Sequence, residues 1–79
     1  MTDKVLTDIR QITADLFGVS ADAVSADSSP STLEGWDSLK HINLMMAIEE
    51  AFGVEILPEE MAEIRSVGDA VRLVNGKLG

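Results

Sequence analysis

Apolar residues recur every three or four positions near the amino terminus. Between residues 3 and 17 they form the stripe Val5, Ile9, Ile12 and Leu16. Charged residues available for solvent lie between them: Asp8, Arg10 and Asp15. This spacing predicts an amphipathic helix over residues 3–17, for which Thr2 is a candidate N-cap and Gly18 a candidate end.

Residues 18–37 separate this helix from the next apolar run. They are rich in Ser, Asp, Ala and Gly and contain Pro30, which is typical of an irregular connection, and we expect one helical turn after Ser20. A connection of this length is unusual in so small a domain unless it has a function. The apolar residues within it are Val19, Val24, Leu33 and Trp36. We therefore predict an ordered loop that these side chains pin across the helices.

The longest apolar run follows Asp37, which is a suitable N-cap. From Leu39 to Phe52 apolar residues occupy nearly every side of the predicted helix, and Gly53 ends it. A helix of this kind is buried on more than one face, or it leaves an apolar patch exposed for docking.

Two further helices are predicted after Gly53. Pro58 and the two glutamates after it favour the start of a short helix, because a single strand would have no partner. Ser66 and Asp69 resemble a capping box at the start of a last helix. The apolar stripe of that helix is Val67, Val71, Val74 and Leu78. The pattern predicts an all-α fold over residues 1–79: one domain, a small four-helix bundle with a short third helix and a long ordered loop between the first two helices.

Composition narrows the class of function. The chain has 14 acidic and 6 basic residues, and a net charge of −8 repels nucleic acid and anionic membranes. It has no cysteine and one histidine, so no thiolate or histidine cluster for a metal ion is expected. With 79 residues and one modest core, a platform is favoured over an enzyme. The sequence shows neither a secretory signal nor a membrane-span pattern, and we expect a cytoplasmic monomer.

The candidate chemistry lies at the start of the central helix, in the run Gly35-Trp36-Asp37-Ser38-Leu39. Ser38 has its hydroxyl at a helix amino terminus, where unpaired N–H groups and the helix dipole stabilise a phosphate. Asp37 can orient a metal ion or a basic group of a modifying enzyme, and Gly35 lets the backbone bend. Because Asp-Ser at a helix start is more often a simple cap, the motif is informative only in its context.

In that context the chain resembles the acyl carrier protein family, which includes the carrier domains of polyketide and nonribosomal peptide synthesis. The family's Asp-Ser-Leu modification motif matches Asp37-Ser38-Leu39. Residues 49–56 resemble the end of the family's second helix and the loop after it, and residues 66–71 resemble its last helix. The resemblance therefore spans nearly the whole chain.

The resemblance implies that a phosphopantetheinyl transferase moves the 4'-phosphopantetheine of coenzyme A onto the hydroxyl of Ser38. Acyl groups then travel as thioesters on the terminal thiol of this arm, which supplies the thiol that the chain lacks. The implied partners are an acyl-loading ligase or transferase, and condensing and other enzymes of fatty acid, polyketide or related biosynthesis. The chemistry belongs to the cofactor and these partners, so the chain itself is expected not to be an enzyme.

The resemblance also implies a docking surface for these partners, formed by Leu39, Met46, Glu49, Glu50 and Ile56. An apolar anchor ringed by acidic groups suits weak contacts that are steered by charge. Taken singly, each glutamate is equally consistent with a solvated helix face, and Met46 is equally consistent with a core position.

Several residues depart from the pattern of fatty acid synthesis. Lys40 and Asn43 stand where those carriers usually have acidic residues, and Trp36 replaces a small residue. We therefore expect a carrier of a specialised pathway, with an aminoacyl (peptidyl) carrier as an alternative. A second alternative is an unmodified acidic module that binds a basic partner. A catalytic pair of Ser38 and His41 is rejected, because no third group or oxyanion loop is evident.

Overall fold

The structure is a computed structural model that describes residues 4–78. Its elements follow in the order α1 (Lys4–Phe17), the 3-10 helix η1 (Ala21–Ala23), α2 (Ser38–Phe52), α3 (Pro58–Glu63) and α4 (Val67–Leu78). The part of the chain described has no strand, so the predicted all-α fold with a short third helix is confirmed. No helix within it has the length and apolar character needed to cross a bilayer. The candidate cap Thr2 lies outside the described residues.

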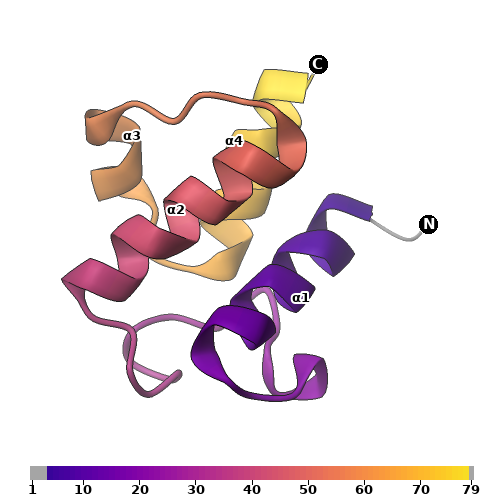
Figure 1. Ribbon diagram of the computed structural model, residues 1–79, viewed down its shortest axis with the longest axis vertical. Helices are drawn as coiled ribbons and strands as arrows, with labels where there is room; N and C mark the ends of the chain where they lie inside the picture. Colours follow the sequence, from indigo (N-terminus) through magenta and orange to yellow (C-terminus); the bar gives the residue numbers. More distant parts are fainter. Residues whose placement is uncertain (1–3, 79) are drawn as a thin grey trace.

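The core lies where α1 packs against α2 and α4 (Figure 1). Its most deeply buried large apolar side chains are Ile9, Val24, Leu44, Met45, Ile48, Val67 and Val74. In the view of Figure 1, α3 and α1 lie on opposite sides of α2, and α3 packs less closely against the other helices. The burial of these aliphatic side chains from three helices is the main force that holds the fold together.

The buried face of α1 differs in part from the predicted stripe. Its buried residues are Val5, Ile9, Thr13 and Ala14. Ile12 and Leu16 are only half-buried. Arg10 does not point freely into solvent, because its Nε donates to the carbonyl of Val24 at 2.7 Å and its Nη2 to the carbonyl of Ala21 at 2.9 Å. The guanidinium therefore fastens the long loop to α1.

The long loop is ordered, as predicted, and it begins with the expected helical turn. Ser20 caps η1, and its hydroxyl accepts the N–H of Asp22 at 3.1 Å. The apolar side chains that the loop inserts into the core are Val24, Leu33 and Trp36. Val19 is exposed and does not pin the loop, which corrects that part of the prediction.

Backbone hydrogen bonds tie the middle of the loop to the start of α4. The N–H groups of Val67 and Gly68 donate to the carbonyls of Ser28 and Ala26, at 2.9 and 2.8 Å. A β-carbon at position 68 would lie 3.0 Å from the carbonyl oxygen of Ala26. Glycine at this position therefore allows the loop and α4 to approach each other.

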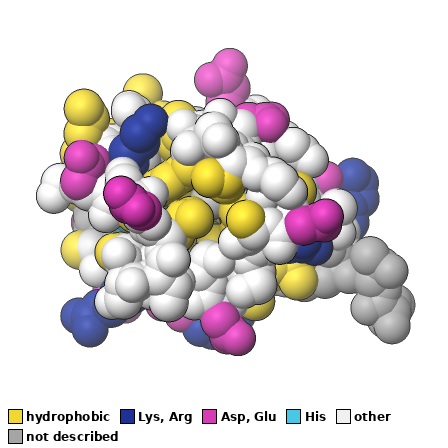
Figure 2. Space-filling model, turned by 90° about the horizontal axis from the view of Figure 1, so that it is seen from below, with side chains coloured by type: hydrophobic (Ala, Val, Ile, Leu, Met, Phe, Trp, Pro, Cys, Tyr) yellow, Lys and Arg dark blue, Asp and Glu magenta, His cyan; other side chains and the backbone are white. Residues whose placement is uncertain are grey.

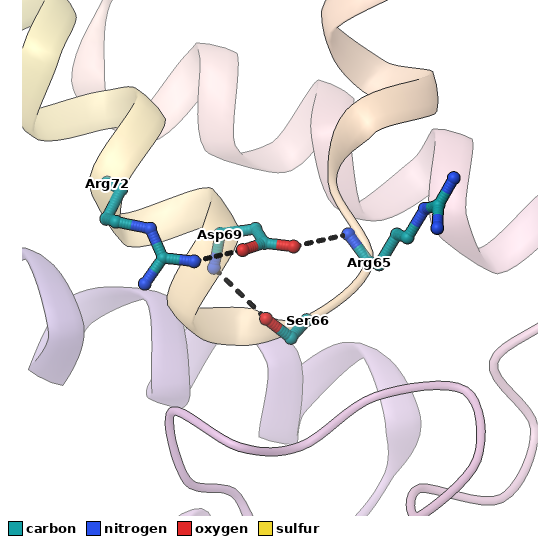
Figure 3. Close-up of polar contacts among 4 residues, drawn as sticks. All are labelled: Arg65, Ser66, Asp69 and Arg72. Atoms are coloured by element: carbon teal, nitrogen blue, oxygen red, sulfur yellow. Dashed lines mark hydrogen bonds and ion pairs between the residues drawn. The ribbon is translucent and has the colours of Figure 1, made fainter.

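The predicted capping box of α4 is present in a shifted form (Figure 3). The hydroxyl of Ser66 accepts the N–H of Asp69 at 3.2 Å, whereas the Asp69 carboxylate accepts the N–H of Arg65 at 3.0 Å. The same carboxylate forms an ion pair with Arg72. At the other end of α4, Leu78 is exposed, because the last turn extends beyond the core. Its predicted place on the buried stripe was therefore wrong.

Glu60 connects α3 to α4. Its Oε1 accepts the N–H of Leu57 at 2.9 Å and lies 2.9 Å from Nζ of Lys77. The hydrogen bond from Leu57, and then the bond and charge of Lys77, lower the pKa of the Glu60 carboxyl. A carboxyl with a lowered pKa stabilises the fold when it is ionised, so this contribution is present at neutral pH and is lost as the pH falls through the Glu60 pKa.

Candidate functional site

Ser38 is the first residue of α2, and its side chain is exposed. Asp37 precedes it as the N-cap, as predicted, with its Oδ1 accepting the N–H of Lys40 at 2.8 Å. The N–H groups of Ser38 and Leu39 have no acceptor within the helix, because the first turn of a helix lacks a preceding turn. The partial positive charge of this helix end favours an anion next to the Ser38 hydroxyl.

Gly35 turns the chain into α2. Its φ angle of 90° lies in the left-handed region that favours glycine, and its carbonyl accepts the N–H of Asp37 at 3.0 Å. This turn buries the side chain of Trp36 and leaves Ser38 exposed two residues later. The bend predicted at Gly35 is therefore present.

An open groove of about 870 Å³ lies beside Ser38, between the long loop, the start of α2 and α3. Most of its exposed lining is apolar. The apolar side chains along it include Trp36, Ile42, Pro58, Met61, Ala62 and Ile64. A chemical group attached to Ser38 therefore has apolar surface within reach.

Trp36 and His41 connect the elements around this groove. The indole Nε1 of Trp36 donates to Nδ1 of His41 at 3.0 Å, and the two rings are stacked with centroids 6.0 Å apart. The Nε2 of His41 lies 2.7 Å from the carbonyl oxygen of Met61 in α3. Trp36 also makes an edge contact with Phe17 at the end of α1. The sequence interpretation missed this linkage, and its one local signal is the five-residue spacing of Trp36 and His41.

The contacts of Lys40 explain why a lysine stands where fatty acid carriers usually have an acidic residue. Its Nζ donates to the carbonyl of Leu16 at 3.1 Å and lies 5.8 Å from the ring centroid of Phe17. The side chain therefore points to the carboxyl end of α1, where a cation is stabilised by the helix dipole. A lysine that departs from the acidic pattern expected for α2 thus has a structural role in joining α2 to α1.

We expect Lys40→Met to lower the free energy of unfolding by about 0.5–1.5 kcal/mol, the usual net contribution of one hydrogen bond. The variant keeps an apolar stem against Phe17 but loses the bond to Leu16. The matched control is Lys4→Met, which removes one exposed ion pair with Asp8 and the same net charge. Its cost should be smaller, about 0.5 kcal/mol or less. Equal losses in urea titrations of the two variants would contradict a specific role of Lys40.

Three apolar side chains of α2 are exposed and share one face of the helix. Leu39, Ile42 and Met46 have exposed fractions of 67%, 47% and 56%. We call these residues the α2 strip. Met46 is therefore on the surface rather than in the core, while the adjacent Met45 is fully buried. Ile42 was not among the predicted docking residues, although it lies one turn after Leu39.

The remaining docking candidates separate in the structure. Glu50 is exposed, whereas Glu49 is half-buried and its Oε2 accepts the N–H of Ile56 at 2.7 Å. Ile56 is only 3% exposed and belongs to the core. We therefore correct the expectation for Ile56, because the chain turns inward after α2 and its side chain offers no surface to a partner.

Acidic side chains surround apolar ones on the surface. Figure 2 shows the molecule from below the view of Figure 1, with apolar side chains gathered near the middle and acidic ones spread around them. Over the whole chain, acidic residues outnumber basic ones by 14 to 6. A surface of this kind favours partners that carry basic groups.

An all-α fold with an exposed serine at a helix amino terminus and an adjoining apolar groove defines a small carrier of a covalently attached group. The chain belongs to the family described as "Phosphopantetheine attachment site", whose model matches residues 7–74. It is also similar to a solved structure of the acyl carrier protein from Enterococcus faecalis. The two share 28% sequence identity and a TM-score of 0.76, over 98% of this chain and 99% of that one.

These comparisons confirm three of the predictions made from the sequence. The chain is an acyl-carrier-like domain, its fold is that of acyl carrier proteins, and its cofactor is covalently attached 4'-phosphopantetheine. Carriers of this class are not enzymes: they interact with a phosphopantetheinyl transferase and with biosynthetic enzymes.

Proposed function

We propose that the protein carries acyl groups as thioesters on a 4'-phosphopantetheine arm attached to Ser38. The observation that carries this proposal is the exposed Ser38 at the start of α2, directly after its cap Asp37 and beside the apolar groove. The family match over residues 7–74 supports an attached arm. The matching motif Asp37-Ser38-Leu39 supports Ser38 as its position.

The residues around Ser38 are suited to this group. The free N–H groups at the start of α2 favour the phosphate of the arm, and the groove offers apolar surface alongside it. When attached, the arm supplies a thiol, which the cysteine-free chain lacks. The chain itself presents Ser38 for modification, holds the charged end of the arm and offers a docking face to the partner enzymes.

We assign docking to the α2 strip together with Glu50. Partners that fit it have an apolar pocket with a basic rim, since the strip is apolar and the surrounding charge is negative. Such partners are a phosphopantetheinyl transferase, an acyl-loading ligase or transferase, and condensing enzymes. Glu49 is a secondary candidate because its carboxylate already binds Ile56, and Ile56 itself is left out.

We further propose a specialised biosynthetic pathway for this carrier. Lys40 and Asn43 leave the first half of α2 without acidic side chains, unlike the usual fatty acid carriers. The proposed pathway is a specialised branch of fatty acid, polyketide or related biosynthesis, and an aminoacyl cargo is the alternative. We also propose that residues 1–79 act as one domain, as a monomer in the cytoplasm.

The test is the intact mass of the protein purified from its native host, followed by peptide mapping. A mass increment of one phosphopantetheinyl group on the peptide that contains Ser38 is expected. An additional acyl or aminoacyl mass on the arm would identify the cargo. An unmodified chain from cells in which the pathway is active would contradict the carrier function and favour the unmodified interaction module.

A further inference from the structure

The two hydrogen bonds of the His41 side chain fit one tautomer of its imidazole ring. The indole N–H of Trp36 can only donate, so Nδ1 of His41 must accept. The carbonyl of Met61 can only accept, so Nε2 of His41 must donate. Both bonds therefore exist together only when the imidazole is neutral with its proton on Nε2.

Protonation of His41 removes one of these bonds. A second proton on Nδ1 would face the indole N–H of Trp36, with a donor against a donor at the present distance of 3.0 Å. Because the Trp36 side chain is buried, its N–H would then lack a partner unless water reached it. The protonated pair cannot keep the geometry of the neutral pair.

Within the described residues, His41 also makes one of the two side-chain polar contacts that join α3 to other helices. This helix has six residues, which is too short to be stable without contacts to the rest of the protein. The Met61 carbonyl lies in its last turn, where carbonyls lack N–H donors from a following turn, and it accepts only the N–H of Ile64 at 3.3 Å from the backbone. His41 adds a shorter bond from α2 at 2.7 Å, and Glu60 holds α3 to α4 through Lys77.

We propose that His41 is a proton-sensitive latch between α2 and α3, and that its protonation releases Trp36 and α3 and so reshapes the groove beside Ser38. Trp36, Ser38, His41 and Met61 all line this groove. The latch is a property of the chain without its arm, so it does not depend on the proposed function.

Few other charged side chains line the groove around His41 in the part of the chain described. Asp37 from the start of α2 and Arg65 from the segment after α3 are the charged side chains that line the groove with His41. The glutamates of α3 are absent from the groove lining within the described residues. On the other side of the first turn of α2, Lys40 is directed to Leu16. Ordinary carboxyl groups are already ionised above about pH 5.5, where a histidine side chain changes its charge.

The chain carries its own reporter of this latch. Trp36 is the one tryptophan and there is no tyrosine, so the fluorescence of the protein comes from the indole that binds His41. Lowering the pH from about 7.5 to about 5.5 should move the emission to longer wavelength as water replaces the imidazole. Amide hydrogen exchange in α3, corrected for its intrinsic pH dependence, should accelerate about fivefold or more, the effect of losing one hydrogen bond.

His41→Gln is the matched control, because glutamine can donate and accept but stays neutral, and every carboxyl group is unchanged. Its emission and α3 exchange should not respond over the same pH range. Equal responses in the two proteins, or a natural chain without any response, would overturn the latch. If circular dichroism shows that His41→Gln is unfolded, hydrogen exchange of the natural chain at the lower pH is the test. Faster exchange in α3 with α1 and α4 still protected supports the latch. Equal acceleration in all helices rejects it.

Discussion

Ser38→Ala should abolish attachment of the phosphopantetheine arm completely. The phosphodiester forms on the Ser38 hydroxyl oxygen, which alanine lacks. The fold should survive, because Ser38 is exposed, Asp37 still caps α2, and alanine is a favourable helix residue. The measurement is the intact mass after incubation with coenzyme A and a phosphopantetheinyl transferase of broad specificity, with circular dichroism as the check on folding.

Ser66→Ala is the matched control for this loss. Ser66 is also a serine at the start of an α-helix, directly before α4, and its hydroxyl accepts the N–H of Asp69. Its loss should lower stability by about 0.5–2 kcal/mol, as for other helix caps, while the arm is still attached. An arm found on the folded Ser38→Ala chain would place the attachment on another hydroxyl and contradict the proposed site.

Met45→Ala should lower the free energy of unfolding by about 2–5 kcal/mol, the usual cost of truncating a large buried side chain. Met45 has no exposed area and lies in the core among α1, α2 and α4. A domain of this size has a total stability of roughly 4–12 kcal/mol, so a large part of it would be lost. Urea unfolding followed by circular dichroism measures this change.

The substitution Met46→Ala, at the next residue, distinguishes a role in core packing from a role in docking to partner enzymes. Met46 is 56% exposed, so its truncation should change stability by about 0.5 kcal/mol or less. It should instead slow arm transfer or acyl loading, because it removes the middle of the proposed docking face. A loss of stability as large as that of Met45→Ala would show that Met46 is a core residue. Unchanged rates with every partner enzyme would contradict its docking role.

Much of the fold could be predicted from the sequence because its signals are local. The cap at Asp37, the left-handed Gly53 after α2 and the start of α3 at Pro58 each depend on residues at most four positions away. The helix bounds follow from these signals together with the apolar spacing. Ser38 could also be predicted as the candidate site, since its motif and the start of its helix are contiguous in the chain.

The surroundings of the site were harder to predict from the sequence, because residues of the same type have different neighbours in the folded chain. Leu39 and Ile56 are both apolar and both near the ends of predicted elements, yet one is exposed and the other buried. Which of them faces the core depends on the path of the chain after Gly53. No spacing rule along one helix contains that information.

The sequence by itself determined the helices, the Asp37 cap of α2, the family and the motif around Ser38, because these depend on short-range chemistry and on residue order. Only the tertiary structure decided that Lys40 binds Leu16, 24 residues away, and that His41 binds Met61, 20 residues away. Each of these polar groups took a partner that packing brought within reach, since a half-buried donor is costly without an acceptor. The groove beside Ser38 arises in the same way, from elements that meet only after the core has formed.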